Sequence, residues 1–169
     1  MSPSLFTTRR ITTAALIAAI YTVLTLILAP ISYGVVQVRL SEAMTLLPIL
    51  FPEAIPGVAI GCLLANILGG SMLPDIIFGT LATLAAAILT YRLREKYWLA
   101  ASMPVIFNGI IVGTVVHYCY SPEVPLYLCM LSVAVGEAIS CYVAGTLLIQ
   151  VLKRTPLTNS IGSSEKVDA

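Results

Sequence analysis

Charged residues are scarce in this chain. Only 10% of its 169 residues are Asp, Glu, Lys or Arg, whereas about a quarter is usual for a soluble domain. Hydrophobic residues make up 59% of the chain, and its mean hydropathy is +0.98. So few charges cannot cover the surface of a water-soluble fold of this length. The composition therefore predicts an integral membrane protein.

Residues that catalysis and metal binding require are also rare. The chain has one histidine and lacks a P-loop, a G-x-S-x-G elbow and an H-E-x-x-H motif. Its four cysteines form no C-x-x-C pair. Cys119 and Cys129 flank one short loop and could pair on an oxidising side, but scattered cysteines in apolar sequence are more often buried hydrophobic residues. The net charge of +1 gives no attraction to nucleic acid. We expect no enzyme, metal site, cofactor or nucleic-acid partner.

The chain instead has apolar segments separated by proline, glycine and charge. A membrane-spanning helix needs about 20 apolar residues. The first, fifth and sixth segments reach this length, and the fourth nearly does. The second and third are short or broken helices, which survive at membrane depth only against protein or a wet cavity. The six segments are residues 11–29, 39–51, 57–68, 74–90, 98–118 and 126–152.

Basic residues indicate how these segments are oriented. Arg9 and Arg10 precede the first segment, a basic cluster at 92–96 follows the fourth, and Lys153 and Arg154 follow the sixth. Six spans place all three groups on one side, which the positive-inside rule makes cytoplasmic. The loops at 31–38, 69–74 and 119–125 then face outward, and the turn at 52–56 faces inward.

The fold prediction is therefore an all-α, six-helix transmembrane bundle with both termini cytoplasmic. The first segment is too long for the core of a signal peptide, so we expect it to be retained as a helix. One membrane domain is expected over residues 1–154. The polar stretch 155–169 has the composition of a disordered tail.

Polar side chains interrupt several of the apolar segments. Ionisable residues inside membrane segments are costly and usually functional. Placed by depth, these side chains converge near the middle and in the outer half of the membrane, beneath the outer loops. This pattern predicts an outward-open pocket for a small polar molecule. The candidate residues are Arg39, Glu42, Asn66, Asp75, Asn108 and Glu137.

Most of these residues also have a structural explanation. Arg39 and Glu42 are three apart and could neutralise each other on one helix face. Asp75 follows a proline at a helix start, where a carboxylate caps the helix and complements its dipole. Asn66 could close the end of a broken helix. Glu137 has no cation within a turn of it, so it needs a partner from another helix or a ligand.

The outer half of the predicted bundle is acidic. It carries Glu42, Asp75, Glu123 and Glu137 against Arg39, a formal net charge of −3 with the histidine neutral. Such a pocket favours a ligand with a cationic amine and N–H donors over an anion such as phosphate.

Small residues recur on the inner half of the first segment. Ala14 with Ala18, and Ala15 with Ala19, form two Ala-x-x-x-Ala steps. This spacing lets another helix approach closely. That helix could belong to the same bundle or to a partner protein.

Several stretches of the sequence resemble the QueT family. They include the R-x-S-E-A motif within Gln37–Pro48 and the P-E-A-I-P-G motif at the end of Phe51–Gly57. The segments Cys62–Gly70 and Asp75–Thr83 are similar as well. Members of this family are identified as substrate-binding S components of energy-coupling factor (ECF) transporters for queuosine precursors.

The resemblance implies an S-component fold in a prokaryotic plasma membrane and a set of protein partners. A transmembrane coupling subunit would dock on the small residues of the first helix, which here are Ala14, Ala15, Ala18 and Ala19. Two separate ATPase subunits would hydrolyse ATP, in keeping with the missing P-loop.

The resemblance also implies a 7-deazaguanine ligand, either queuine or its aminomethyl precursor. A carboxylate can accept hydrogen bonds from the ring N–H and the exocyclic amine of a base. We expect Glu137 and Asn108 to bind this edge. A second carboxylate, Glu42 or Asp75, would pair with the protonated amine of the ligand.

Other functions remain compatible with the same residues. The pocket could hold another purine-like or cationic solute. A stand-alone proton-coupled transporter could use Glu137 as its proton carrier, although no inverted repeat is evident. A membrane assembly factor would have no use for an acidic pocket. An intramembrane enzyme has the least support.

Overall fold

Every regular element in the computed structural model is a helix within the residues it describes, 7–28 and 39–155. Four helices are long and apolar enough to cross a membrane, and two shorter apolar helices follow the first of them. The prediction of an all-helical membrane protein is confirmed. The predicted outer loop at 31–38 and residues 156–169 of the predicted tail lie outside the described residues.

The helices follow the predicted apolar segments closely. Regular α-helices form the first, third and fifth: α1 (Thr8–Ile27), α3 (Ala54–Leu68) and α5 (Tyr97–Cys119). The second is a 3₁₀-helix, η1 (Leu40–Ile49). The fourth opens with a π-helical turn, η2 (Asp75–Gly79), and continues as α4 (Thr80–Arg92). The sixth consists of α6 (Leu126–Ala138), a π-helical stretch η3 (Ile139–Gly145) and α7 (Thr146–Arg154).

The two short segments differ from expectation in local geometry. A 3₁₀-helix rises about 2.0 Å per residue, so the ten residues of η1 extend about 20 Å. The same residues would extend only about 15 Å as an α-helix. The helix α3 begins at Ala54, so Pro56 lies in its first turn, where a missing N–H does no harm. The turn between η1 and α3 is therefore shorter than the predicted 52–56.

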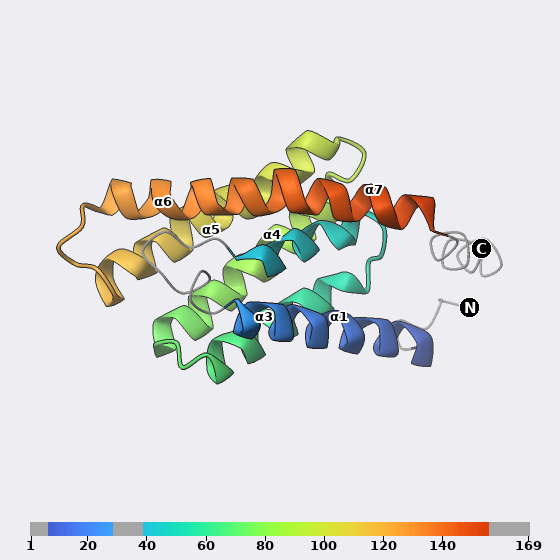
Figure 1. Ribbon diagram of the computed structural model, residues 1–169, viewed down its shortest axis with the longest axis horizontal. Coiled ribbons are helices and arrows are strands. Elements are labelled where there is room, and N and C mark those ends of the chain that lie inside the picture. The colour runs from blue at the N-terminus through green and yellow to red at the C-terminus, as the bar shows by residue number, and fades with distance from the viewer. Residues whose placement is uncertain (1–6, 29–38, 156–169) are drawn as a thin grey trace.

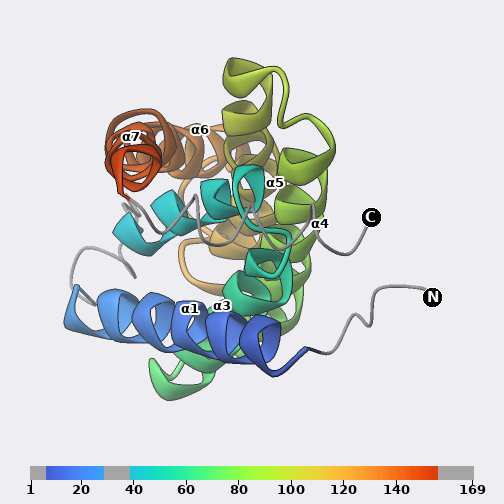
Figure 2. The same cartoon turned by 90° about the vertical axis from the view of Figure 1, so that its right-hand side faces the viewer.

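The helices run lengthwise between two ends of the molecule (Figure 1). The start of α1, the end of α4 and the end of α7 lie together at one end, and the α3–η2 and α5–α6 connections lie at the other. All three basic groups therefore gather at one end, as the predicted orientation requires. Viewed along the bundle, η1 lies in the middle, with α1 and α3 on one side and α4 to α7 around the rest (Figure 2).

Several charged side chains are buried in this structure and many large apolar side chains are exposed, which is the reverse of the distribution in a soluble protein. Arg39, Glu42, Asp75 and Glu137 are all at most 4% exposed. Large apolar side chains instead cover the outside of the helices, as expected where the surrounding solvent is lipid. Examples with more than half of their surface exposed are Leu16, Ile27, Leu81, Ile110, Leu131, Val143 and Leu147.

Glycines bring α1 and α3 into close contact. A Cβ added at Gly61 would lie 2.8 Å from Cβ of Tyr21 and 3.0 Å from the carbonyl oxygen of Ala18. One turn earlier, a Cβ at Gly57 would lie 2.9 Å from the carbonyl oxygen of Ala14. Small residues four apart let membrane helices pack this tightly. The contact fixes the position of Tyr21, which matters for the site below.

We predict that Gly61→Val destabilises the protein, because the added methyl groups would push α1 away from α3. Overpacking of this kind costs about 1–3 kcal/mol, so the melting temperature in detergent should fall. Ala19→Val is the matched control, since Ala19 is exposed on α1 and its substitution should have little effect. Equal melting temperatures for the two variants would contradict the α1–α3 contact.

Candidate functional site

The site is organised around η1. Eight consecutive residues of this helix, 41–48, are buried. With three residues per turn, side chains three apart align along one edge of a 3₁₀-helix. Glu42 and Thr45 therefore lie in one row, and Arg39 is the extended N-cap residue just before the helix. The Thr45 hydroxyl donates to the backbone oxygen of Glu42 at 2.5 Å.

Glu42 is held by two helices and is 1% exposed. Its Oε1 accepts hydrogen bonds from the hydroxyl of Tyr21 on α1 and, at 3.4 Å, from the hydroxyl of Thr83 on α4. Its Oε2 is buried without a hydrogen-bond partner among the described residues. One carboxylate oxygen thus anchors the side chain, and the other is left to accept a further hydrogen bond.

Arg39 pairs with Asp75. The distance from Nη2 to Oδ2 is 3.6 Å, and both side chains are nearly inaccessible. The same Oδ2 accepts a hydrogen bond from Tyr120 at 3.3 Å, and Tyr120 accepts one from the backbone N–H of Met72 at 2.9 Å. The ion pair of Arg39 therefore joins two helices and does not simply neutralise Glu42.

Asp75 lies in the first turn of its helix, directly after Pro74, where a carboxylate complements the helix dipole. Its Oδ1 is buried without a hydrogen-bond partner among the described residues. Gly79 keeps this region open, because a Cβ there would lie 3.1 Å from Oδ1 of Asp75 and 3.3 Å from Nδ2 of Asn66.

Glu137 and Asn108 form a pair between α6 and α5. Nδ2 of Asn108 donates to Oε1 of Glu137 at 3.0 Å, and both residues are at most 4% exposed. Asn108 is thus the partner from another helix that Glu137 was predicted to need. The helix of Glu137 also packs on η1, because the thiol of Cys141, four residues after Glu137, lies 3.7 Å from the backbone oxygen of Glu42. The Asn108–Glu137 pair and Glu42 therefore belong to one cluster around η1.

Asn66 links the end of α3 to the start of η2. Its Nδ2 donates to the backbone oxygen of Asp75 at 3.4 Å and to the sulfur of Cys62 at 3.6 Å. The role of closing the end of a short helix therefore fits, and Asn66 also reaches the cluster. All six predicted polar residues are buried in this region.

Five of the six share one feature: each has a buried oxygen without a hydrogen-bond partner among residues 7–28 and 39–155. In both asparagines the nitrogen faces an acceptor, so the oxygen is the atom left over. Leaving one such group unpaired costs about 1–3 kcal/mol, and folded proteins contain only a few. A ligand rich in hydrogen-bond donors would satisfy them together. The atoms are Oε2 of Glu42, Oδ1 of Asn66, Oδ1 of Asp75, Oδ1 of Asn108 and Oε2 of Glu137.

The cluster is acidic, though less so than predicted. Glu123 is exposed in the loop after α5 and takes no part in it. His117 lies near the C-terminal end of α5, where its Nδ1 is 2.8 Å from the backbone oxygen of Val124. Three carboxylates and the Arg39 guanidinium remain in the interior.

The comparison with known families identifies the chain. The QueT transporter family matches residues 11–154, which include nearly all of the described helices. The chain belongs to the QueT transporter family. The resemblance noted in the sequence is thereby confirmed, and the chain is a membrane transport protein rather than a member of an enzyme family.

A curated relative of this QueT-family chain is the protein named Queuosine precursor transporter QueT from Lactococcus lactis subsp. cremoris (strain MG1363). The two are 30% identical over 161 residues, which cover 88% of this chain and 95% of the relative. No solved structure matches the chain. The helix contacts described above are therefore the structural basis for interpreting this site.

Sequence reasoning missed several residues of the site. Tyr21 and Thr83 hold Glu42, and Tyr120 holds Asp75. Tyr21 could have been found, because it is the one aromatic residue of α1 (Thr8–Ile27) and carries a hydroxyl in the middle of an apolar helix. Thr83 carries no comparable signal, since threonine is common in these helices and often bonds to its own backbone, as Thr22 does with Ala18.

The two alanine steps on α1 have different environments. Ala18 is 4% exposed and faces Gly61, and the backbone of Ala14 lies against Gly57. These residues pack within the bundle itself. Ala15 and Ala19 are exposed, so they are the pair available to another protein. The four free cysteines include Cys62 and Cys141 beside the cluster, and the described residues contain no group of metal ligands.

We predict that Tyr21→Phe lowers the melting temperature of the ligand-free protein. The change removes a donor from the buried carboxylate of Glu42, which should cost about 1–3 kcal/mol. Tyr118→Phe is the control, because Tyr118 is 70% exposed. If both variants melt at the same temperature as the unmodified protein, the Tyr21 hydroxyl does not support the site.

Proposed function

We propose that this chain is the substrate-binding S component of an ECF transporter and that it captures a queuosine precursor from outside the cell. The observation that carries the proposal is the set of five buried oxygens without partners. The name of the Lactococcus lactis relative supports the class of cargo. Partner subunits would supply the energy for import.

The chemistry of the cluster matches a 7-deazaguanine with an aminomethyl group. Such a molecule offers ring N–H groups, an exocyclic amine and a protonated amine, all of them donors. Oxygens that can only accept, held in a buried site, select for donors because a mismatched ligand would leave them unpaired. A phosphate or carboxylate ligand would instead add acceptors and negative charge.

The cluster divides into two parts with different roles in this proposal. Asn108 and Glu137 present two oxygens from one hydrogen-bonded pair, an arrangement that suits the adjacent N–H groups of the base edge. Arg39 offsets the charge of Asp75 through their ion pair. Glu42 is then the better candidate to receive the cationic amine, while Asn66 and Asp75 accept from the remaining N–H groups.

We further propose that the bundle crosses the plasma membrane six times with both ends in the cytoplasm. The helices alternate in direction, and the basic groups lie at one end of the bundle (Figure 1). The exposed pair Ala15 and Ala19 would contact the transmembrane coupling subunit, which would in turn assemble with two ATPase subunits. A stand-alone proton-coupled transporter is the second candidate, because Glu137 is a buried carboxylate with one oxygen left over.

The first test is thermal stability of the purified chain in detergent with the aminomethyl precursor, queuine, guanine, thiamine and riboflavin. A ligand that binds only the folded state stabilises it by about 2.7 kcal/mol at 100 times its Kd. We expect a rise in melting temperature with the deazaguanines alone. A well-folded sample that responds to none of them, or to thiamine or riboflavin instead, would refute the proposed cargo.

Glu137→Gln should weaken binding of the deazaguanine by about tenfold or more, because a charge-assisted hydrogen bond contributes about 1.5–3 kcal/mol. The ligand-free melting temperature should not fall, since the amide is less costly to bury than the charge. Glu123→Gln makes the same change on an exposed loop and should leave affinity unchanged. Full affinity in the Glu137 variant would remove this residue from the site.

Ala19→Leu should reduce co-purification of the chain with the coupling and ATPase subunits without changing deazaguanine affinity. The larger side chain would keep the partner helix at a distance. Val143→Leu, at an exposed position on η3, should assemble normally. Uptake that continues without any ATPase subunit and collapses with the proton gradient would favour the second candidate instead.

A further inference from the structure

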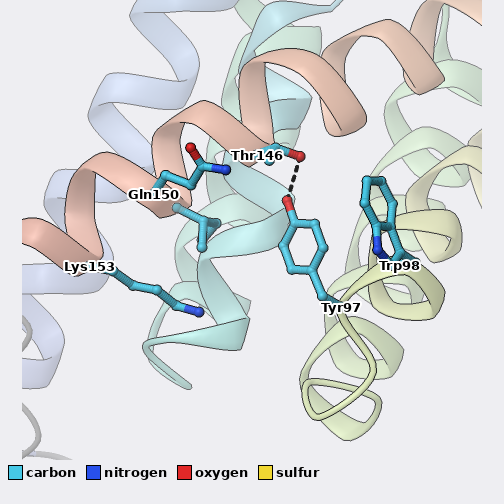
Figure 3. Close-up of a pocket in the computed structure, with 6 residues that line it drawn as sticks. Tyr97, Trp98, Thr146, Gln150 and Lys153 are labelled. Atoms are coloured by element: carbon cyan, nitrogen blue, oxygen red, sulfur yellow. Dashed lines mark hydrogen bonds between the residues drawn. The ribbon is translucent and has the colours of Figure 1, made fainter.

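A cavity that shares no residue with the polar cluster lies between the start of α5 and α7. Its volume is about 210 Å³. On α7 the lining residues are spaced three and four apart, so they occupy one face of the helix. Figure 3 shows that Tyr97 reaches from α5 to Thr146 of α7, with its hydroxyl donating to the threonine hydroxyl at 2.7 Å. The cavity, called the inner groove below, is lined by Tyr97, Trp98, Thr146, Ile149, Gln150 and Lys153.

The inner groove lies at the end of the molecule where the basic residues gather. Trp98 comes two residues after Lys96, where the charged connection ends, and it is 69% exposed. Its ring stacks on Tyr142 at 5.8 Å and meets Tyr97 edge-on at 5.7 Å. Aromatic side chains gathered in this way are typical of the interfacial belt of membrane proteins.

This end of the molecule is positively charged. Among the residues described, Lys153 has no ion-pair partner, although its side chain lines the groove. Within residues 7–28 and 39–155, the acidic residues at the same end are Glu53 and Glu95. The basic residues outnumber them: Arg9, Arg10, Arg92, Arg94, Lys96, Lys153 and Arg154.

We propose that the inner groove binds the headgroup of an anionic phospholipid. The Lys153 amine and the Gln150 amide can donate to phosphate oxygens, and basic pockets between membrane helices are suited to such headgroups. Next to the groove, Leu147 and Val143 are 62% and 67% exposed. An acyl chain can lie along them while the headgroup stays in the groove. This continuity with the lipid-facing surface favours a lipid over free phosphate or a soluble partner.

The proposal is independent of the transported cargo, because the groove shares no residue with the polar cluster. It can be tested without any partner subunit. Trp98 is the only tryptophan in the chain, so its fluorescence reports on this groove alone. Lipids with brominated acyl chains quench tryptophan only when they lie beside it.

The experiment places the full chain in phosphatidylcholine vesicles with equal small fractions of either brominated phosphatidylglycerol or brominated phosphatidylcholine. We expect at least about twofold stronger quenching by the anionic lipid, as would follow from a preference of about half a kcal/mol or more. Lys153→Gln should abolish the preference, and Lys153→Arg should retain it. Lys96→Gln, a change outside the groove, should also retain it.

Two results would overturn the proposal. Equal quenching by the two brominated lipids would mean that the groove does not select an anionic headgroup. The lipid preference would instead be due to the general charge of this end if it persisted in Lys153→Gln, or if Lys96→Gln removed it to the same extent. Melting temperatures of all three variants, measured in the same vesicles, ensure that only folded protein is compared.

Discussion

Water is absent from the hydrocarbon core of a membrane, so a carboxylate at that depth has to find hydrogen-bond donors on neighbouring helices. Glu42 finds them on α1 and α4, through Tyr21 and Thr83. Glu137 finds one on α5, through Asn108. Every one of these bonds joins two helices, so the polar groups that would hold a ligand also hold the bundle together. In each carboxylate these bonds fix one oxygen. The second oxygen is thereby held in position, although it has no hydrogen-bond partner of its own among the described residues.

Close approach of the helices is what makes these bonds possible. Between apolar helices in lipid the hydrophobic effect is weak, and packing depends on small residues. Gly61 lets α1 come near enough for Tyr21 to reach Glu42. Gly113 does the same between α5 and α6, where an added Cβ would lie 2.5 Å from Cα of Met130. The positions of the buried carboxylates Glu42 and Glu137 thus depend on glycines of neighbouring helix contacts.

The sequence predicts the helices well, and it singles out the polar residues that the structure buries, because charge stands out against a background of apolar residues. It does not predict their partners. Arg39 and Glu42 are three apart and invite pairing, yet Arg39 pairs with Asp75, which only the folded chain brings near. Threonines such as Thr83 give no warning of their role, since they are frequent throughout. The 3₁₀ and π-helical stretches also have no sequence signature, because tertiary packing decides between helix types of similar local energy.

The choice of a 3₁₀-helix for η1 has a mechanical consequence. Ten residues wound in this way are about 5 Å longer than the same residues in an α-helix. Rewinding η1 would therefore shorten it by about one α-helical turn and would also rotate Glu42 and Thr45 out of their common row. The length of this helix and the alignment of Glu42 with Thr45 are coupled variables. A pull or a push on one end of η1 would therefore change the geometry of the polar cluster.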